Sequence, residues 1–513
     1  MRALAQAGWT PIAKQTFRVA NVSSAILVGF FGVAIALMTL RRGVWADEFI
    51  TVAWTTPDTT IREFLRVMIE RDFHPILYYG MIYLLQALGE TDIAQLRLVN
   101  LLGLPLVIFA IAYGYRQKSI SLSQALVIWV LFASAPIFFE YFAELRGYFL
   151  IYAGSIAISI VWYVLNRRIE ANQDPPTATM IASWAVCLAV FVNLHYFATI
   201  LGGMLTAVLL AQLAVRRLWP QVLMVACISL AVAAPALVLG ALQVFSTPKG
   251  LMSWIKTSPT ESVKIVLRMI ENAAAWNLAA VAGAVVTCLF MLEDRRKWNE
   301  HRTALILLGI VGMFLGALVI VNAFSPLVVD RYLIASAGAV TVAVGLLAAS
   351  SGAPLWLPTA ASVIALLFQA QIYRSNLGID QRGWLPSARA VAQLKSECPT
   401  AKIFAYVVYP RTSELSDVAL GLKINAVSYG YYAKKFHFEF ENLLPGSTVT
   451  ASGPCPSVIW LEHMYSFLLP TPEPKAEQVL SKLQINKIGL AELKRYGWGM
   501  LIIVRDGSVL TGN

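Results

Sequence analysis

The chain has 513 residues, of which 58% are hydrophobic and only 13% are charged, and its mean hydropathy is +0.66. A soluble domain carries about 25% charged residues, so this composition excludes a protein whose whole surface meets water. The formal net charge of +11 is compatible with nucleic-acid binding. Many of the basic residues flank apolar runs, however, where such residues set topology and contact lipid phosphates. We therefore expect membrane lipids, and no nucleic acid, as partners.

Long apolar runs predict a polytopic α-helical membrane protein. Lipid offers the backbone no hydrogen-bond partners, and these runs do not alternate in the manner of barrel strands. Eleven spans are expected, at residues 20–41, 96–115, 121–139, 148–166, 179–193, 197–215, 221–243, 272–292, 303–322, 333–349 and 354–372.

Basic residues precede the first span and fall in most of the connections that alternation places on the same side. They are Lys14 and Arg18, Arg116 and Lys118, Arg167 and Arg168, Arg216 and Arg217, and Arg295, Arg296 and Lys297. The positive-inside rule then predicts a cytoplasmic N-terminus in the plasma (inner) membrane and an external, periplasmic tail. The turn near residues 350–354 carries no positive charge and adds nothing to this argument.

The first external loop, residues 42–95, predicts two interfacial helices. Thr60 and Glu63 are spaced as a capping box, and apolar residues follow at helical spacing opposite charged ones. The segment Pro75–Leu88 is apolar but too short to span. A second external loop, residues 244–271, carries Lys249, Lys256, Lys264 and Arg268 around Trp254.

The composition changes after about Tyr373, where polar residues and short β-type runs appear. Strands are expected at 403–409, 458–461 and 500–504, with helices at 387–397 and 475–483. We expect a membrane domain over residues 1–373, which includes the loop 42–95, and an external α/β domain over residues 374–513. Cys398 and Cys455 are the two cysteines of the tail; an oxidising compartment favours a bridge, but spacing alone leaves bridged and free thiols equally open.

Polar residues that could carry chemistry lie just outside the apolar spans, on the side expected to be external. Asp47 and Glu48 follow the first span; a carboxylate there could act as a general base, or it could be an ordinary loop acid. His74 precedes Pro75 and Tyr78, and could contact a phosphate, a sugar or a metal, or serve as a cap.

The later clusters are richer in arginine and aromatic residues. Glu144, Arg146 and Tyr148 stand between the third and fourth spans, where Arg could bind phosphate or pair with the Glu. His195 and Tyr196, and then Arg331 and Tyr332, lie at external ends of later spans; the alternative for these is an interfacial aromatic belt with an arginine anchor.

These clusters, in this order, resemble the GT-C glycosyltransferases, in the bacterial branch related to the protein O-mannosyltransferases and the lipid A aminoarabinose transferase. The likeness covers roughly residues 20–350 and is carried by Asp47 and Glu48, His74 and Pro75 with Tyr78 and Tyr79, Leu88 and Gly89 followed by Arg97 and Leu98, Glu144 to Tyr148, His195 and Tyr196, and Asp330 to Tyr332. The family often has a second proline after the histidine, where Ile76 stands here.

The resemblance implies a GT-C fold, a sugar donor linked to polyprenyl phosphate, and Asp47 as the catalytic carboxylate with Glu48 beside it. The expected reaction transfers the sugar, with inversion, to a hydroxyl of a lipid, glycan or protein. Arginines such as Arg146 and Arg331 would stabilise the leaving phosphate. No cofactor is required, although a divalent metal could bind near Asp47, Glu48 or His74.

Other functions stay open at this point. A lipid-linked oligosaccharide ligase or polymerase would share the donor chemistry. A transporter or flippase would place polar residues near the bilayer midplane, whereas the spans here are mostly free of charge. A receptor or scaffold would act through the tail.

Overall fold

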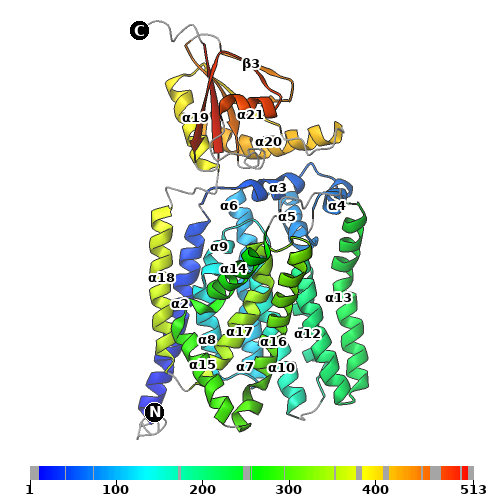
Figure 1. The fold of residues 1–513 in the computed structure, drawn as a ribbon. Coiled ribbons are helices and arrows are strands. Elements are labelled where there is room, and N and C mark those ends of the chain that lie inside the picture. The colour runs from blue at the N-terminus through cyan, green and yellow to red at the C-terminus, as the bar shows by residue number, and fades with distance from the viewer. Residues whose placement is uncertain are drawn as a thin grey trace. The chain divides into compact units, whose positions relative to one another are not determined.

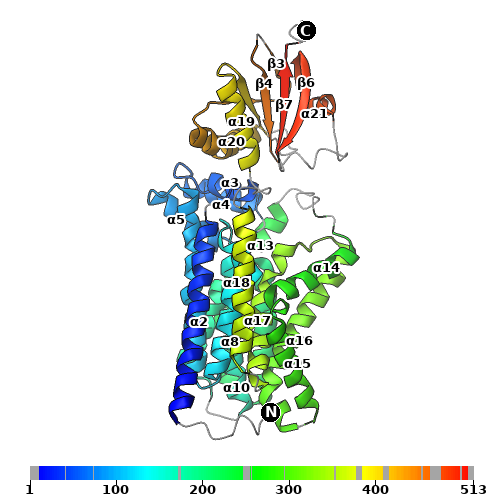
Figure 2. The ribbon, with the colours of Figure 1, turned by 90° about the vertical axis from the view of Figure 1, so that its left-hand side faces the viewer.

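The computed structural model describes residues 11–40, 42–72, 74–171, 175–246, 255, 257–293, 295–351, 354–376, 384–407, 415–451, 454–462, 475–496 and 499–506. The chain forms two compact units (Figures 1 and 2). One comprises Met1–Leu40 and Thr59–Ile372 and is helical; the other comprises Arg41–Asp58 and Tyr373–Asn513 and contains the strands.

The helical unit has seven described helices long and apolar enough to cross a membrane. They lie in α2 (Pro11–Thr39), α6 to α7 (Ile93–Leu96 and Gly103–Arg116, joined by the 3-10 turn Arg97–Leu102), α10 (Tyr148–Glu170), α12 (Tyr196–Val215), α13 (Trp219–Ser246), α16 (Arg295–Phe324), and α17 (Ile334–Ser350) with the 3-10 turn Asp330–Leu333 before it. The protein is therefore a multi-pass membrane protein.

Two bent helix pairs and two shorter apolar helices complete this unit. The pairs are α8 (Leu122–Ser134) with α9 (Pro136–Phe142), bent by 51°, and α14 (Pro259–Ile270) with α15 (Leu278–Glu293); the shorter helices are α11 (Ala178–Val192) and α18 (Trp356–Asn376). Each of the eleven spans expected from the sequence overlaps one of these helices or pairs, but among the described residues only seven, or nine if each bent pair is one span, are long and apolar enough to cross a membrane. The expectation of a mostly helical membrane domain is confirmed.

One predicted span differs from the structure. Residues 272–292 were expected to form a single helix, but α15 begins only at Leu278, after a π-helical turn at Glu271–Ala275. The reason lies in Asn277, whose Oδ1 accepts the Ala280 N–H at 3.0 Å and so caps α15. Of the loop before it, Lys249, Trp254 and Lys256 lie outside the described residues.

Helix α10 is the centre of the bundle and packs closely against α17. A Cβ on Gly338 would lie 2.5 Å from the Ile156 nitrogen, so only glycine permits this approach. Ser155 Oγ donates to the Ala335 carbonyl (2.6 Å) and accepts the Ala339 N–H (3.1 Å). This packing fixes α10 and α17 relative to one another; the candidate residue Tyr148 begins α10, and Arg331 and Tyr332 lie in the 3-10 turn just before α17.

Two short helices follow in the first loop, as expected. Thr60 and Glu63 form the capping box that begins α4 (Ile61–Glu70). Helix α4 buries Phe64 and Met68 and leaves Ile61 and Leu65 exposed. Helix α5 (Leu77–Ala87) has 11 residues, which is too short to cross a bilayer. Both properties fit helices that lie at a lipid–water boundary.

The second unit is an α/β domain. Its elements are α3 (Ala46–Trp54), α19 (Leu385–Glu397), β1 (Lys402–Tyr406), α20 (Leu415–Phe436), β2 (Glu441–Leu443), β3 (Thr448–Thr450), β4 (Ser457–Leu461), α21 (Ala476–Lys482), β5 (Asn486–Ile488), β6 (Leu490–Tyr496) and β7 (Gly499–Arg505). The main sheet has the order β2-β1-β4-β7-β6, parallel over its first three strands and antiparallel from β4 onward. The predicted strands correspond to β1, β4 and β7, and the predicted helices to α19 and α21.

Helices cover both faces of this sheet (Figure 2). On one face, Val479 and Leu480 of α21 pack against Ile459 and Ile502 in a single buried cluster. On the other face lie α19 and α20, and the Tyr429 ring of α20 is 4.7 Å from the Trp460 ring.

Helix α3, which carries Asp47 and Glu48, belongs to this second unit and not to the membrane domain in which the sequence placed the whole loop 42–95. The Phe49 ring lies 4.9 Å from the Trp384 ring and 6.0 Å from the Tyr432 ring. Val44 N–H donates to the Tyr432 hydroxyl at 3.0 Å, and the Trp384 N–H donates to the Val44 carbonyl at 3.4 Å. An apolar face around Phe49 thus ties α3 to aromatic residues far along the chain.

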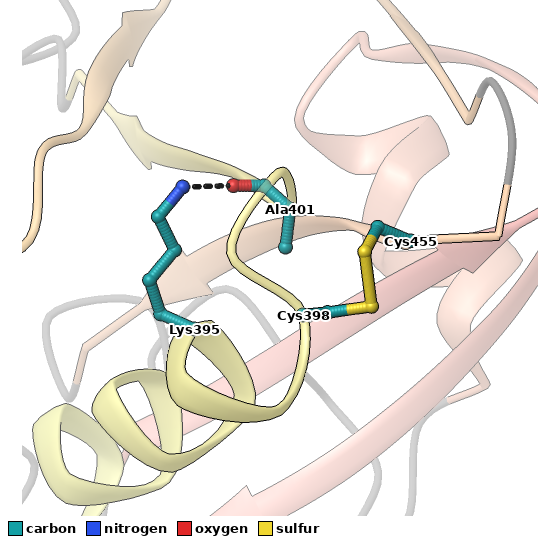
Figure 3. Close-up of a disulfide and its surroundings, with 4 residues drawn as sticks. All are labelled: Lys395, Cys398, Ala401 and Cys455. Carbon is teal, nitrogen blue, oxygen red and sulfur yellow. Dashed lines mark hydrogen bonds between the residues drawn. A yellow bond between two sulfur atoms is a disulfide. The ribbon is translucent and has the colours of Figure 1, made fainter.

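Cys398 and Cys455 form a disulfide, with their Cα atoms 5.6 Å apart (Figure 3). The bridge joins the end of α19 to the segment that enters β4. Lys395 Nζ donates to the Ala401 carbonyl at 2.7 Å in the same turn. The sequence left open whether these two cysteines are bridged or free, and the structure shows that they are bridged.

Candidate functional site

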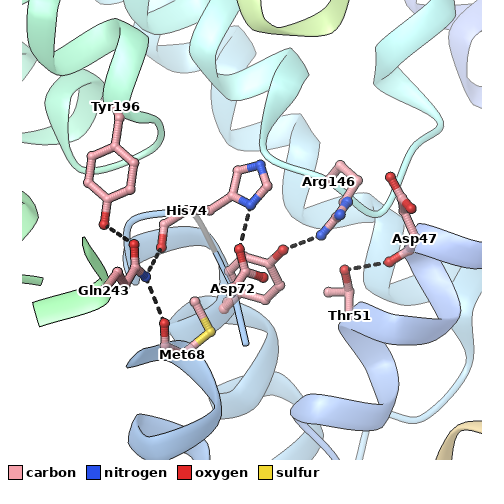
Figure 4. Close-up of polar contacts among 9 residues, drawn as sticks. Asp47, Thr51, Met68, Asp72, His74, Arg146, Tyr196 and Gln243 are labelled. Carbon is pink, nitrogen blue, oxygen red and sulfur yellow. Dashed lines mark hydrogen bonds and ion pairs between the residues drawn. The ribbon is translucent and has the colours of Figure 1, made fainter. Parts of the chain in front are cut away.

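Five segments of the helical unit meet at one end of the bundle. They are the loop after α4, the start of α5, the turn between α9 and α10, the N-terminus of α12 and the 3-10 turn before α17. Figure 4 shows Asp72, His74, Arg146 and Tyr196 from these segments.

Asp72 and His74 form a buried pair in the loop after α4. His74 Nδ1 lies 2.5 Å from Asp72 Oδ1, and only 3% of the Asp72 side chain is exposed. Burial alone raises the pKa of the Asp72 carboxyl, but the charge and hydrogen bond of His74, with the charge of Arg146, outweigh it and bring the pKa below its usual value. Asp72 is therefore an ionised carboxylate inside the site.

Arg146 reaches this pair from the turn between α9 and α10. Its Nη1 donates to the Tyr79 hydroxyl, and its Cζ lies 5.7 Å from the centre of the Tyr79 ring. Burial raises the pKa of Tyr79 well above its ordinary value. The phenol consequently stays protonated beside Asp72, and the guanidinium is held against an aromatic face.

His195 stands at the centre of a group of aromatic rings. Its ring lies 5.2 Å from that of His74 and 5.0 Å from that of Tyr332. His195 Nδ1 accepts the Phe197 N–H at 3.1 Å as the cap of α12. Burial lowers the pKa of His195 well below its usual value, and the charges of His74 and Arg331 act in the same direction. The ring is thus neutral, with its proton on Nε2.

Arg331 supplies a second guanidinium to the same cluster. Its Cζ lies 6.0 Å from the Tyr148 ring and 6.0 Å from the Tyr332 ring. Asp330, the neighbour of Arg331, pairs instead with Arg268 at 3.1 Å. Arg331 and Arg146 therefore approach one aromatic cluster from two different turns.

The structure brings together most of the residues predicted from the sequence. His74, Arg146, Tyr148, His195, Arg331 and Tyr332 form connected contacts in the helical unit. Tyr78 is 2% exposed and packs on the neighbouring turn, since a Cβ on Gly147 would lie 3.4 Å from it. Glu144 is buried in that turn.

The chain is similar in structure to ArnT, the lipid A aminoarabinose transferase of the GT-C class. The structure of ArnT from Cupriavidus metallidurans bound to undecaprenyl phosphate matches with a TM-score of 0.48 and 11% identity, over 93% of this chain and 97% of that chain. Its apo structure matches with a TM-score of 0.46 and 10% identity, over 97% and 99%. No protein-family model and no curated protein matches the chain.

Asp47 and Glu48 lie in the first turn of α3, in the other unit, and their surroundings differ. Glu48 is fully buried, and its Oε2 accepts the Trp45 N–H at 3.2 Å, which closes the start of the helix. Asp47 is half-buried, and its backbone carbonyl accepts from the Thr51 hydroxyl at 2.9 Å (Figure 4). Capping alone accounts for an acid at position 48.

Gln243, near the end of α13, is a site residue that the sequence analysis missed. Its Nε2 donates to the carbonyls of Met68 (2.6 Å) and His74 (3.3 Å), and its Oε1 accepts from the Tyr196 hydroxyl at 2.7 Å (Figure 4). The amide thereby holds the loop that carries Asp72 and His74. Tyr196 was predicted as a binding residue, but its hydroxyl is used in the hydrogen bond to Gln243. The sequence feature that could have identified Gln243 is the presence of a polar glutamine in an otherwise apolar span.

Two further residues were missed. Asn100 Nδ2 donates to the Phe142 carbonyl (2.9 Å) and the Glu144 carbonyl (2.7 Å), and so fixes the turn that carries Arg146. Asp72 was missed because nothing in the sequence distinguishes it from other loop acids. Within the described parts of the chain, no group of three or more His, Cys, Asp or Glu is placed to hold a metal ion.

Proposed function

We propose that this protein is a glycosyltransferase that moves a sugar from a polyprenyl-phosphate carrier to a hydroxyl acceptor. The observation that carries the proposal is the pair of guanidinium groups, Arg146 and Arg331, held against tyrosine rings where apolar helices end. Guanidinium groups bind phosphate through charge-assisted hydrogen bonds that can be bidentate. A lipid-linked phosphate has such an anionic group together with an apolar chain for the surrounding helices.

The aromatic cluster suits the sugar. Tyrosine and histidine rings bind a pyranose through their faces and their polar edges, and neutral His195 offers an N–H at Nε2. The Asp72–His74 pair adds an ionised carboxylate that can accept from a sugar hydroxyl. These groups would orient the anomeric carbon toward the acceptor.

In the proposed reaction the acceptor oxygen attacks the anomeric carbon and its proton passes to Asp47. The bond between the anomeric carbon and the phosphate oxygen breaks, so the configuration inverts and polyprenyl phosphate leaves. Arg146 and Arg331 stabilise the charge that grows on the phosphate. We assign the base to Asp47 and not to Glu48, because the Glu48 carboxylate caps α3.

We also propose that the site end of the bundle faces the periplasm. The site lies at the starts of α10 and α12, whereas Arg167, Arg168, Arg216 and Arg217 lie at their ends. A 23-residue helix is about 35 Å long, enough to separate the two groups by a membrane. The basic end would then be cytoplasmic.

The decisive experiment compares lipids and glycans, by mass spectrometry, from cells with and without the gene. We expect a sugar linked to polyprenyl phosphate to accumulate on loss, and one envelope glycan, lipid or protein to lose the same sugar mass. Re-expression of the wild type should reverse both changes. Unchanged carrier lipids together with unchanged acceptors would refute the proposal.

A further inference from the structure

A polar pocket, of about 730 Å³, lies at the end of the helical unit away from the candidate site. Its lining comes from the turn between α7 and α8, from the last turns of α10 and from the part of α16 near His301. The lining residues are Tyr115, Arg116, Lys118, Ser119, Ile120, Ser121, Gln124, Tyr163, Arg167 and His301.

The charge of this pocket has one sign. Arg116, Lys118 and Arg167 are basic, and His301 adds a fourth basic residue. No Asp or Glu is among the described residues that line it. Concave surfaces lined by one sign of charge concentrate counter-ions of the other sign. The pocket is therefore suited to a ligand with a phosphate or a similar anion.

The turn that carries two of these cations has a defined backbone. Lys118 has a φ of 55°, and its N–H donates to the Tyr115 carbonyl at 3.0 Å. The Ile120 N–H donates to the Gly114 carbonyl at 3.3 Å, and the Ile120 side chain is 2% exposed. The side chains of Arg116 and Lys118 are both exposed at the pocket. The cations thus stand on a fixed frame without being part of the core.

An exposed apolar stripe on α7 leads to the same pocket. Ile108, Phe109 and Tyr115 of α7 are 52%, 47% and 43% exposed, and Leu102, in the 3-10 turn just before α7, is 54% exposed. In a membrane-spanning helix such a face lies against acyl chains. Tyr115 belongs both to the stripe and to the pocket lining. The apolar and cationic surfaces are therefore continuous, and an amphiphile would use both, whereas a free phosphate would use only the pocket.

We propose that this pocket binds the headgroup phosphate of an anionic phospholipid, whose acyl chains lie along the exposed face of α7. Arg116, Lys118 and Arg167 contact the phosphate, and Ser119 and Gln124 offer polar partners for the rest of the headgroup. The site is separate from the sugar-transfer residues and does not depend on the proposed activity. It is a lipid site at the basic end of the bundle.

The test uses the full-length protein purified in detergent and native mass spectrometry with added phosphatidylglycerol or phosphatidylcholine. Phosphatidylglycerol should bind about tenfold more tightly than phosphatidylcholine. The double variant Arg116→Gln, Lys118→Gln should bind phosphatidylglycerol about tenfold more weakly than the wild type, since each basic contact to a lipid headgroup contributes several-fold. The single variants should show intermediate losses, and all three should keep the wild-type melting temperature because both side chains are exposed.

The chain offers a matched control in Arg216→Gln, Arg217→Gln. This pair also ends a spanning helix, removes the same charge and includes a residue with positive φ, 57° at Arg217. Neither residue is among those that line the pocket, and Arg216 donates to the Glu170 carbonyl. The control should change phosphatidylglycerol binding by less than about twofold.

Three outcomes would overturn the proposal. An equal loss of phosphatidylglycerol affinity in the control variant would mean that any basic residue at this end of the bundle supports lipid binding, whether or not it lines the pocket. Equal binding of phosphatidylcholine would remove the role of the negative charge. Displacement of phosphatidylglycerol by millimolar inorganic phosphate would identify a site for free phosphate in place of a lipid.

Discussion

Asp47 and Glu48 are adjacent in the sequence, yet their carboxylates have different surroundings. We expect Asp47→Asn to lower the turnover number for sugar transfer by at least about 10²-fold, because asparagine cannot accept the acceptor's proton. Glu48→Gln keeps an oxygen that can accept the Trp45 N–H, and should retain most of the activity. Transfer assays in membranes, normalised to protein level, measure both. Near-normal turnover of Asp47→Asn would exclude it as the base, and Asp72→Asn would then be the next variant to assay.

Arg331 should matter more than its exposed neighbour in space, Arg268. Loss of the Arg331 guanidinium removes a cation that stabilises the leaving phosphate, so Arg331→Ala should lower kcat/KM by about 10²- to 10³-fold. Arg268→Ala removes an ion pair with Asp330 that is largely solvent-exposed and should change kcat/KM by less than about threefold. Steady-state kinetics with a polyprenyl-phosphate-linked donor decide between them; similar losses in the two variants would argue against a specific role for Arg331.

The depressed pKa of His195 predicts an acid-sensitive stability. The unfolded chain takes up a proton at this histidine near pH 6.5, whereas the folded protein does so only at lower pH. The unfolded state therefore binds more protons over that window, and stability should fall as the pH drops below about 6.5. The lowered pKa of Asp72 acts separately, because its contribution is lost only below about pH 4.

Melting temperatures in detergent between pH 7.5 and pH 5 measure this effect. The variant His195→Gln, which cannot titrate, should show a smaller fall over the same range than the wild type. Identical pH profiles for the two proteins would mean that His195 does not stay neutral when folded.

At the scale of elements, α3 is the notable case, because it is nine residues long and belongs to a unit made mostly of residues beyond 372. Its position in that unit depends on Phe49 and on the contacts of Val44 with Tyr432. If Asp47 is the base, these contacts position it. Phe49→Ala should then lower kcat by about tenfold or more with little change in the KM for the donor.

Leu480→Ala is the control for α3. It creates a similar cavity in the same unit but on the opposite face of the sheet, in the cluster with α21. Both variants should lose stability by about 2–5 kcal/mol, and only Phe49→Ala should lose turnover beyond the loss of folded protein. An equal loss of turnover in the two variants would show that the strand-containing unit affects catalysis only through the stability of the fold.

Sequence reasoning found the elements that depend on local composition. The spanning helices were predicted because an apolar run of about 20 residues has few other uses, and the Thr60–Glu63 box because its geometry is local. The attachment of α3 could not be predicted, since the aromatic partners of Phe49 are more than 300 residues away. Gln243 was missed for the same reason, because its acceptors at Met68 and His74 become visible only when the chain is folded.

At the scale of the whole molecule, the topology can be tested directly. In a variant without Cys187, Cys227 and Cys288, a cysteine at Gln117 would report on the basic end of the bundle, and a cysteine at Ser396 would report on the strand-containing unit. We expect a membrane-impermeant maleimide to label Ser396→Cys in intact spheroplasts and Gln117→Cys only after permeabilisation, because the basic end of the bundle should be cytoplasmic. Labelling of Gln117→Cys before permeabilisation would reverse the orientation, and with it the side on which transfer takes place.

The chain enters the strand-containing unit twice, first for residues 41–58 and again from residue 373. A fragment made of the tail alone would consequently be an incomplete fold, with Trp384, Tyr431 and Tyr432 stripped of the ring that fills the space between them. Gene truncation cannot cleanly divide this protein into an anchor and a detachable soluble part. A fragment in which α3 is fused ahead of residue 384 restores the Phe49 ring to its aromatic partners, and we expect this fragment to fold on its own.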